Sequence, residues 1–567
     1  MSRRAQAEGP FDAIVIGSGM SGGWAMKELC EAGLRTLVLE RGRMVEHGVD
    51  YTTEHKNPWE MPGRGRIPPE VLERDYSVQR RTFALDEYTR HFFYKDTDVP
   101  IVEAEPFTWI QSGIVGGRSV LWGRQSYRWS PMDFEANKTD GHGVDWPIRY
   151  EDIAPWYDRV EREIGVSGSA EDLPQLPDGV FQRPMEMNVV ERHAKGAIEE
   201  TFPGRHMIIG RTATLTEPIG ERAACHYCGP CRRGCSTGSY YSTQSVALPA
   251  ARATGNLTLL AHAVVDSILH DENTNRATGV RVIDAETHEV REHSARLIFV
   301  CASAMGTARI LLHSRSEAFP NGLANNSGMV GRNIVEHHAR VGARGRFEGY
   351  TDRYYRGNRP NGIYVPRFRN LDAGSSHADF VRGYGLQGSA SRIGWGRGAS
   401  MRGFGPGFKE RLRVPGEWQM TLQGYGEFLP RTDNHCTLDD EVTDTWGIPA
   451  LRLNVTRGEN EIAMRRDMAV TAAEMLEAAG AVGVETFDRP EIPPGTANHE
   501  MGTARMGRDP RSSVLNAFNQ SHDVPNVFVT DGSCMTSSAC QNPSLTYLAL
   551  TSRACRYAVE QVRRGDL

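Results

Sequence analysis

Long apolar runs are absent from this chain of 567 residues. No stretch approaches the roughly 18 consecutive apolar residues that a transmembrane helix needs, so the sequence predicts no membrane span. The opening stretch, MSRRAQAEGPFDAIVIGSG, holds two arginines but no apolar segment ahead of the first predicted strand. We therefore expect no signal peptide in this stretch.

A surplus of positive charge is also absent. The 65 lysines and arginines face 71 aspartates and glutamates, which gives a net charge of −6 without a long run of either sign. Because phosphate backbones are bound by dense Lys/Arg stripes, we expect no nucleic-acid partner. A hydrophobic fraction of 39% and a charged fraction of 24% are typical of a folded globular protein, and the length predicts two or more domains.

Most of the 10 cysteines lack a spacing pattern that would indicate disulfide pairing. Six of them are scattered, and we expect these to be buried apolar side chains rather than disulfides. The other four lie in the stretch CHYCGPCRRGC, with the spacing C-x2-C-x2-C-x3-C. They are Cys225, Cys228, Cys231 and Cys235.

The amino-terminal stretch FDAIVIGSGMSGGWAMKELCEAGLRTLVLERG is typical of a βαβ unit. An apolar strand leads into Gly17-x-Gly19-x-x-Gly22, a helix follows and ends at a glycine, and a second strand closes on Glu40. The glycines allow a tight turn, the approach of a pyrophosphate and close packing of helix on strand. An acid about 20 residues further on accepts hydrogen bonds from a ribose. These parts, in this order, predict a dinucleotide site for FAD or NAD.

Four later segments narrow the choice of cofactor. They are GIVGGRSVLWGR (113–124), FVCASAMGTARILLHS (299–314), GMVGRNIVEHH (328–338), and the stretch from NHEMGTARMG to DGSCMTSSACQNPSLTYLAL (498–550). Together with the glycine motif they resemble the glucose–methanol–choline oxidoreductases, a family of FAD enzymes that oxidise alcohols. The resemblance covers nearly the whole chain, and it implies FAD.

The resemblance also implies an α/β fold (α+β overall) with a discontinuous domain organisation. A Rossmann-like FAD-binding domain is expected from residues 1–60, 100–145, 205–340 and 490–567, with the cysteine loop at 220–240. A substrate domain on an antiparallel or mixed sheet is expected from residues 61–99, 146–204 and 341–489. Within the last range, GIYVPRFRN, EWQMTLQGYGEFLP and ALRLNV are typical of strands, and ENEIAMRRDMAVTAAEMLEAAGA predicts a helix behind the sheet.

Several residues match positions that contact FAD in this family. The segment GGRSVLWG is expected to wrap the flavin ring, AHAVVDSIL to meet the adenine, and the stretch that begins DGS to lie beside the ribityl chain. The resemblance thus implies cofactor contacts for Gly117, Ser119, Val265, Asp531, Gly532 and Asn542. Leu121 stands where some relatives have a histidine bonded to FAD, so non-covalent FAD is expected.

Two residues match the pair that acts on the alcohol. His499, in NHEMGT, matches the family's catalytic base, and neutral histidine suits the removal of a hydroxyl proton. Asn542, in ACQNPSLT, matches the second member of the pair, which is histidine or asparagine in the family. Asn542 also fits a helix N-cap followed by Pro543. His337 and His338 match a segment beside the FAD and are expected to be structural.

The stretch WQMTLQGYGE, on the expected substrate sheet, offers Trp418, Gln419, Gln423, Tyr425 and Glu427. A sugar site needs converging hydrogen-bonding groups and an apolar face. Because side chains alternate along a strand, only some of these residues can face the flavin. We predict Gln419, Gln423 and Tyr425 as substrate residues. For each one singly, an outward-facing polar residue is an equally good interpretation.

The cysteine loop has three interpretations. Structural zinc uses four cysteines, usually as two CxxC pairs far apart, whereas here the pairs are fused. Free or disulfide-bonded thiols are the second possibility. The observed spacing is that of bacterial ferredoxins, and Gly229 and Gly234 would allow the sharp turns. Ser236 follows the last cysteine where ferredoxins have proline, so [4Fe–4S] and [3Fe–4S] both stay open.

The resemblance extends to iron–sulfur flavin subunits of the bacterial glucoside 3-dehydrogenase type. It implies hydride transfer from the C3 hydroxyl carbon of a sugar or glycoside to flavin N5, with electrons leaving through the cluster to a cytochrome c. Gluconate or another sugar position is possible within the same family. The alternatives are an oxygen-using glycoside or pyranose oxidase with a structural zinc, and a flavoprotein without a substrate.

A small chaperone-like subunit with a twin-arginine signal is the expected partner. It would carry the folded chain to the periplasm, and without it the chain would be cytoplasmic.

Overall fold

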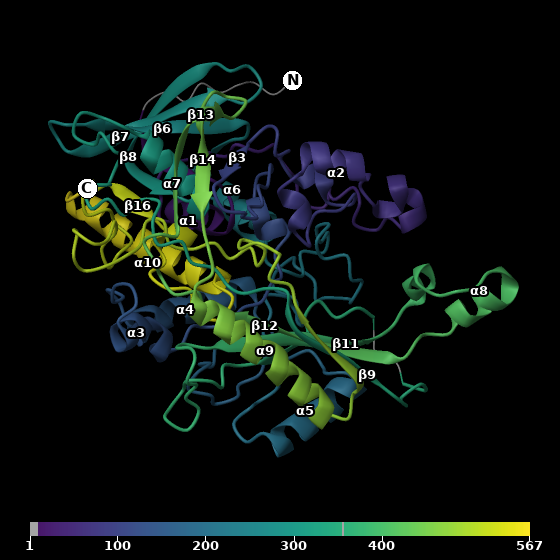
Figure 1. Ribbon diagram of the computed structural model, residues 1–567. Helices are drawn as coiled ribbons and strands as arrows, with labels where there is room; N and C mark the ends of the chain where they lie inside the picture. The colour runs from purple at the N-terminus through teal and green to yellow at the C-terminus, as the bar shows by residue number, and fades with distance from the viewer. Residues whose placement is uncertain (1–9, 354–356) are drawn as a thin grey trace.

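A computed structural model describes residues 10–353 and 357–567 of the chain. Its helices are α1 (Met20–Glu31), α2 (Pro69–Asp75), α3 (Pro131–Asp140), α4 (Tyr150–Ile164), α5 (Val189–Thr201), α6 (Leu248–Ala253), α7 (Ala304–His313), α8 (Gly405–Arg413), α9 (Glu459–Ala478) and α10 (Ser544–Arg564). Its strands are β1 (Phe11–Ile16), β2 (Thr36–Leu39), β3 (Ile101–Glu103), β4 (Ile208–Ile209), β5 (Leu257–Leu260), β6 (Ala263–Asp271), β7 (Arg276–Asp284), β8 (Val290–Val300), β9 (Val341–Phe347), β10 (Ile363–Val365), β11 (Tyr384–Arg392), β12 (Trp418–Gly426), β13 (His435–Thr443), β14 (Pro449–Asn454), β15 (Val482–Asp488) and β16 (Val527–Val529). Figure 1 shows this mixed α/β arrangement, which confirms the predicted fold class.

The largest sheet has the strand order β5-β2-β1-β8-β7-β6, with β16 beside β8. β5, β2, β1, β8 and β16 run parallel, whereas β6 and β7 form an antiparallel extension of β8. β1 lies between β2 and β8, and its residues from Ala13 to Ile16 are buried on both faces. Since α1 connects the parallel neighbours β1 and β2, the predicted βαβ unit is confirmed.

Both ends of the chain build the helical layer on this sheet. α1 packs against α10, and Trp24 Nε1 donates a hydrogen bond to Ser552 Oγ at 2.5 Å. α4 in turn packs against α10, and its residues Ile153 and Tyr157 belong to the same core as β1. The predicted substrate domain includes residues 146–204, whereas α4, within that range, packs on the side of the nucleotide-binding sheet. The division into two domains as a whole stays a prediction.

The second sheet has the antiparallel order β15-β9-β12-β11-β10-β4. α9 and α5 cover one face, and Figure 1 shows α9 lying across β12, β11 and β9. Trp418, Met420 and Leu422 of β12 pack there against Met464 and Met468 of α9. The odd-numbered residues of β12 therefore lie on the opposite face. A sheet with a helix behind it is what the sequence predicts for this region.

One predicted strand of this region belongs elsewhere. ALRLNV forms β14, which pairs with β13 and, in parallel, with β3 in a separate three-stranded sheet. Leu451 and Leu453 are buried there against Phe107 and Trp109. The short apolar run fits either sheet, and only the long-range pairing with β3 decides between them.

α9 and α10 are the longest helices, with 20 and 21 residues. Each carries a charged, solvent-facing side, as in Glu459 or Arg564. Within residues 10–353 and 357–567, no helix combines the length and the apolar character that crossing a bilayer requires.

Candidate active site

The glycine motif forms the turn between β1 and α1. Gly17 has φ +91°, and a Cβ atom there would lie 2.6 Å from the carbonyl oxygen of Cys301. A Cβ at Gly22 would lie 2.0 Å from the Gly17 oxygen, which explains the close helix–strand packing. At Gly19 an added Cβ would meet no protein atom within 4 Å. The space beside Gly19, at the amino terminus of α1, is open to a phosphate.

Glu40 closes the other side of this turn. Its carboxylate accepts hydrogen bonds from Ser18 N at 3.1 Å, Ser18 Oγ at 2.6 Å and Gly42 N at 2.8 Å. A carboxylate has about four acceptor positions, so a ribose hydroxyl can still be accommodated. Glu40 thus shapes the turn as well as facing the cavity.

A single large cavity runs from this turn to the predicted catalytic pair, with about 1890 Å³ of space free of protein atoms. Among its lining residues are Gly17, Gly19, Glu40, Gly117, Ser119, Leu121, Val265, His499, Asp531, Gly532 and Asn542. The lining of the cavity therefore joins the glycine turn to the predicted catalytic pair, as an extended dinucleotide requires. Gly22 is the one predicted cofactor residue that does not line it, because it packs against Gly17.

Two of the predicted cofactor residues also hold the cavity wall in shape. Asp531 accepts hydrogen bonds from Thr307 Oγ1 at 2.6 Å and Ser533 N at 2.9 Å, and burial raises its pKa. Ser119 Oγ donates to the Gly116 carbonyl at 2.6 Å and accepts from Thr243 N at 3.0 Å. Their side chains are engaged within the protein, so contacts to FAD there are left to the backbone and to the remaining lone pairs.

The structure brings His499 and Asn542 together at the end of the cavity. Asn542 Nδ2 lies 3.2 Å from His499 Nε2. Asn542 precedes α10, whose N-cap is Pro543, so the alternative of Asn542 as the N-cap is wrong. The loop that carries His499 is held by Glu336, whose carboxylate accepts hydrogen bonds from Gly495 N and Ala497 N.

His499 is kept neutral by its surroundings. Burial lowers its pKa well below the usual 6.5, and the nearby His337 and Arg118 lower it further. A neutral imidazole is the form that can accept a proton. Tyr425, whose ring centre lies 6.3 Å from that of His499, stays in its uncharged form because burial raises its pKa.

The predicted substrate residues divide into two groups. Gln423 and Tyr425 lie together, since Gln423 Nε2 donates to Tyr425 Oη at 2.8 Å, and Tyr425 lies beside His499. Gln419 is on the same face of β12 but six residues from Tyr425, or about 20 Å at roughly 3.4 Å per residue. The structure thus does not bring Gln419 to the pair.

The other two candidates of this stretch are used for packing and charge pairing. Trp418 is buried against α9, on the face away from the cavity. Glu427 forms a buried ion pair with Arg382 at 2.5 Å. Neither therefore presents its side chain to a substrate.

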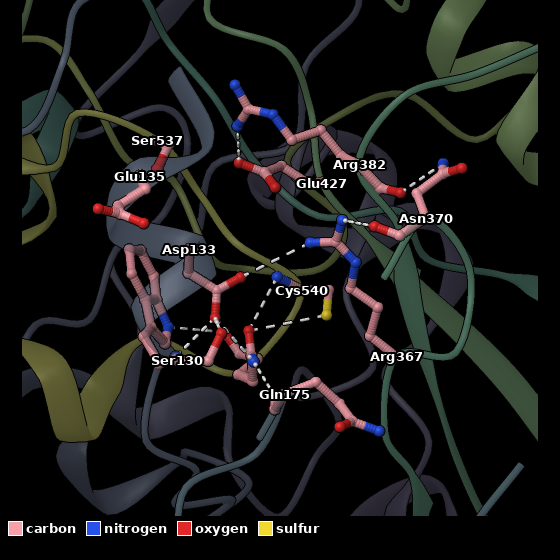
Figure 2. A network of polar contacts seen from close by, with 12 residues as sticks. Ser130, Asp133, Glu135, Gln175, Arg367, Asn370, Arg382, Glu427, Ser537 and Cys540 are labelled. Carbon is pink, nitrogen blue, oxygen red and sulfur yellow. Dashed lines mark hydrogen bonds and ion pairs between the residues drawn. The ribbon is translucent and has the colours of Figure 1, made fainter. Parts of the chain in front are cut away.

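The residues before Asn542 are anchored in a buried polar network (Figure 2). Gln541 Nε2 donates to Asp133 at 3.0 Å and to the Gln175 carbonyl at 3.3 Å. Asp133 also accepts hydrogen bonds from Ser130 N and Oγ, and its Oδ1 lies 3.9 Å from Nη1 of Arg367, which follows β10 of the second sheet. Figure 2 shows the contact between Asp133 and Arg367. The network ties α3, the Asn542 segment and the second sheet to one another.

The sequence reasoning missed three functional candidates, Gln387, Arg118 and Glu500, and gave a fourth, His337, only a structural role. Gln387 Nε2 donates to Asn542 Oδ1 at 2.6 Å, and His337 Nδ1 lies 2.8 Å from His499 Nδ1. Arg118 lines the cavity and pairs with the buried Glu500 at 2.8 Å. Arg118, Glu500 and His337 all lie inside quoted motifs. Gln387 lies in β11, which has no motif, and only its pairing with Gln423 of β12 reveals it.

The cysteine loop packs against residues 51–88. Gly229 and Gly234 have φ of +102° and +105°, as the predicted sharp turns require. Arg233 lies over the ring of Tyr88 at 3.4 Å and donates to the Lys56 carbonyl at 2.9 Å. Arg232 donates to the Phe83 carbonyl at 2.5 Å.

The loop also adjoins the cavity. Phe83, held by Arg232, is one of the residues that line it. On the other side of the loop, Tyr240 Oη donates to the Val120 carbonyl at 2.7 Å, next to the cavity residue Leu121. The cysteine loop is therefore one residue away from the cavity on both sides.

The four thiols of the loop are not arranged as a ligand set. All four are free; Cys228 is exposed, and Cys225, Cys231 and Cys235 are partly buried. Burial, with repulsion from the other three thiols, raises the pKa of Cys225 to about 11. Among the residues that the structure describes, no three or more His, Cys, Asp or Glu side chains converge as metal ligands.

Comparison with known proteins identifies the family. Two GMC oxidoreductase models, of the amino- and carboxyl-terminal parts, match residues 210–339 and 430–551. The chain is 34% identical to 2-methyl-1,2-propanediol dehydrogenase of Mycolicibacterium austroafricanum, over 96% of this chain and 94% of the relative. It is 27% identical to the fructose dehydrogenase large subunit of Gluconobacter japonicus, over 98% of each chain.

A solved structure agrees at the level of the fold. Pyridoxine 4-oxidase from Mesorbium loti superimposes with a TM-score of 0.58 and 16% identity, over 96% of this chain and 98% of that one. The glycine turn, the long cavity and the histidine–asparagine pair are explained by the same assignment. The chain belongs to the glucose–methanol–choline (GMC) oxidoreductase family, whose members bind FAD and act on CH–OH donors.

Proposed function

We propose that the protein is an FAD-dependent dehydrogenase that oxidises a secondary alcohol of a sugar or glycoside, with the C3 hydroxyl as the favoured position. The observation that carries this proposal is the order of three features along one cavity: the glycine turn, the His499–Asn542 pair and the adjoining cysteine loop. FAD is held without a covalent bond, since Leu121 offers no nucleophile.

The pair supplies the proton chemistry. FAD, held at the glycine turn, would supply the acceptor for the hydride of the carbinol carbon. His499 Nε2 takes the hydroxyl proton, and Asn542 Nδ2 donates a hydrogen bond to the same oxygen. The cluster formed by Gln387, Gln423 and Tyr425 offers further hydrogen-bonding groups around this point, which suits a polyhydroxylated substrate.

The cysteine loop supplies the route for electrons. Its ferredoxin-type spacing, its glycine turns and its place beside the cavity support an iron–sulfur cluster held by Cys225, Cys228, Cys231 and Cys235, or by three of them. Burial, with repulsion from neighbouring thiols, raises the pKa of Cys225 and Cys228, and bound iron would offset the charge of their thiolates. A cytochrome-type acceptor and a small partner subunit, with co-export to the periplasm, complete the proposal.

A substrate panel tests this function. Anaerobic protein is mixed with a methyl glucoside, glucose, fructose or gluconate while flavin absorbance and the paramagnetic signal of the cluster are followed. We expect the glucoside to bleach the flavin fastest and to yield a 3-keto product by NMR. Catalytic peroxide formation, with zinc and no iron, would instead identify an oxidase.

A small vicinal diol is the second candidate substrate. It is favoured by the 34% identity to 2-methyl-1,2-propanediol dehydrogenase, which is higher than the 27% identity to the fructose dehydrogenase large subunit. The same panel includes 2-methyl-1,2-propanediol. If the diol bleaches the flavin faster than every sugar does, a small vicinal diol replaces the sugar as the proposed substrate. The proposed roles of His499 and Asn542 stay the same.

The pH dependence of flavin reduction follows from the environment of His499. Its depressed pKa leaves the base free at neutral pH, with Arg118, Glu500, His337 and Tyr425 as the groups facing it. We expect kcat/KM for anaerobic flavin reduction to be level from about pH 9 to 7 and to fall only below the ordinary histidine pKa of about 6.5. An inflection above pH 7 would contradict a base with a lowered pKa.

A further inference from the structure

We propose that His337 is a positioning residue that holds His499 in the tautomer with a free Nε2, through a chain of hydrogen bonds that starts at the Ser538 carbonyl. This inference rests on the proposed role of His499 as the base. It assigns a function to a histidine that the sequence indicated only as structural.

The backbone places the two histidines opposite each other. Val335 and Met501 form an isolated antiparallel bridge, with Val335 N bonded to Met501 O at 3.0 Å and Met501 N to Val335 O at 2.9 Å. Two residues onward on one segment and two back on the other, His337 and His499 lie side by side on one face. Their ring centres are 4.8 Å apart at 78°.

The Ser538 carbonyl decides which atoms donate and which accept in this series of hydrogen bonds. His337 Nε2 lies 2.9 Å from this oxygen, which can only accept a hydrogen bond, so Nε2 carries the proton. Burial lowers the pKa of His337 to about 4, and the ring is therefore neutral at physiological pH. A neutral ring protonated at Nε2 has a lone pair at Nδ1.

That lone pair faces His499. The two Nδ1 atoms are 2.8 Å apart, a hydrogen-bond distance, and only one of them can carry the shared proton. Because His337 Nδ1 accepts, His499 Nδ1 donates. His499 Nε2 is then the unprotonated nitrogen, and it is the one that lies at the cavity end beside Asn542.

The hydrogen bonds at the other end of this network, around Asn542, run in the same direction. Gln387 Nε2 donates to Asn542 Oδ1 at 2.6 Å, which turns Asn542 Nδ2 towards His499 Nε2 at 3.2 Å. A flipped Asn542 amide would set its oxygen against the lone pair of His499. Protons and amide orientations in such networks are assigned from the partners. Here the Ser538 carbonyl decides the tautomer, and the orientation of the Gln387 and Asn542 amides agrees with it.

This direction matters for the reaction. The other tautomer of His499 would present Nε2–H to the alcohol and could not take its proton. Once Nε2 has taken the proton, Nδ1–H remains bonded to the neutral His337, which stabilises the charged ring by a charge-assisted hydrogen bond. His337 does not itself pass the proton on, since its own Nε2–H faces a carbonyl.

Two substitutions separate tautomer control from packing. His337→Asn keeps an acceptor near the position of Nδ1 but leaves a void, whereas His337→Phe fills the space and removes the acceptor. In anaerobic stopped-flow experiments we expect His337→Phe to slow flavin reduction about 100-fold with KM changed less than about threefold, and His337→Asn to stay within about tenfold of the parent. The reverse order of the two variants would show a packing role and overturn the proposal.

A second readout does not depend on turnover. With 15N-labelled histidine, the His499 signals, assigned by their loss in His499→Gln, should show a protonated Nδ1 and an unprotonated Nε2 in the parent protein. His337→Phe should show a mixture of the two tautomers. An Nε2-protonated His499 in the parent would overturn the inference. The expected tautomer in a protein whose flavin no alcohol bleaches would uphold the inference and refute the proposed function.

Discussion

His499→Ala should reduce the rate of flavin reduction by an alcohol by about 10³-fold, within the range that a positioned general base contributes. The loss arises because no other neutral base in the structure lies at hydrogen-bond distance from the Asn542 amide at the end of the cavity, among the residues described. The measurement is single-turnover bleaching of bound FAD in the absence of oxygen. FAD content should be unchanged, since the glycine turn lies at the other end of the cavity.

His55→Ala is the matched control, because the side chain of His55 is 63% exposed and lies outside the cavity. It should reduce its flavin at the parent rate. Rapid bleaching in His499→Ala would refute the assignment of the base, whereas loss of FAD from that variant would mean that the residue also holds the cofactor.

Cys228→Ser should separate flavin reduction by the alcohol from the reduction of cytochrome c. Cys228 is the exposed thiol of the loop, and replacing it removes a ligand of the proposed cluster without touching the cavity wall. We expect iron content to fall and reduction of cytochrome c to drop at least about tenfold, in line with the loss on removing a metal-site partner. Flavin bleaching by the alcohol should continue at the parent rate.

Cys436→Ala is the control for loss of a thiol as such, since Cys436 is buried in the core of the three-stranded sheet. It should keep its iron. If Cys228→Ser keeps both iron and cytochrome reduction, Cys228 is not a ligand; repeating the substitution at Cys225, Cys231 and Cys235 then shows whether three cysteines or four bind iron. Zinc in the parent protein would overturn the electron route.

The site residues that could be predicted lie in short motifs, in which the residue types themselves indicate the chemistry or the backbone geometry. Gly17, Gly19 and Gly22 act because they have no side chain, so the presence of glycine at these positions indicates the backbone geometry of the turn. His499 and Asn542 lie in motifs that can be matched one by one. The structure then places them 3.2 Å apart, although 43 positions separate them.

The parts that escaped prediction depend on partners far away in the sequence. Gln387 meets Asn542 because β11 pairs with β12 in one register, and a shift of one residue would turn it to the other face. Gln419 fits the alternation of β12 as well as Tyr425 does, but its position along the strand removes it from the pair. The sheet to which β14 belongs could not be predicted for the same reason, since β14 pairs with β3, which lies about 350 residues earlier in the sequence.

The packing of α1 on α10 has a consequence for the order of events during synthesis. The glycine turn is synthesised long before its partners, because its sheet needs β8 and β16, and α1 packs on α10, which follows about 500 residues later. Contacts of such long sequence separation form slowly and only after both partners exist. The nascent chain is therefore unable to complete this layer of its nucleotide-binding domain until α10 has been made, and we expect FAD to be loaded only after that point.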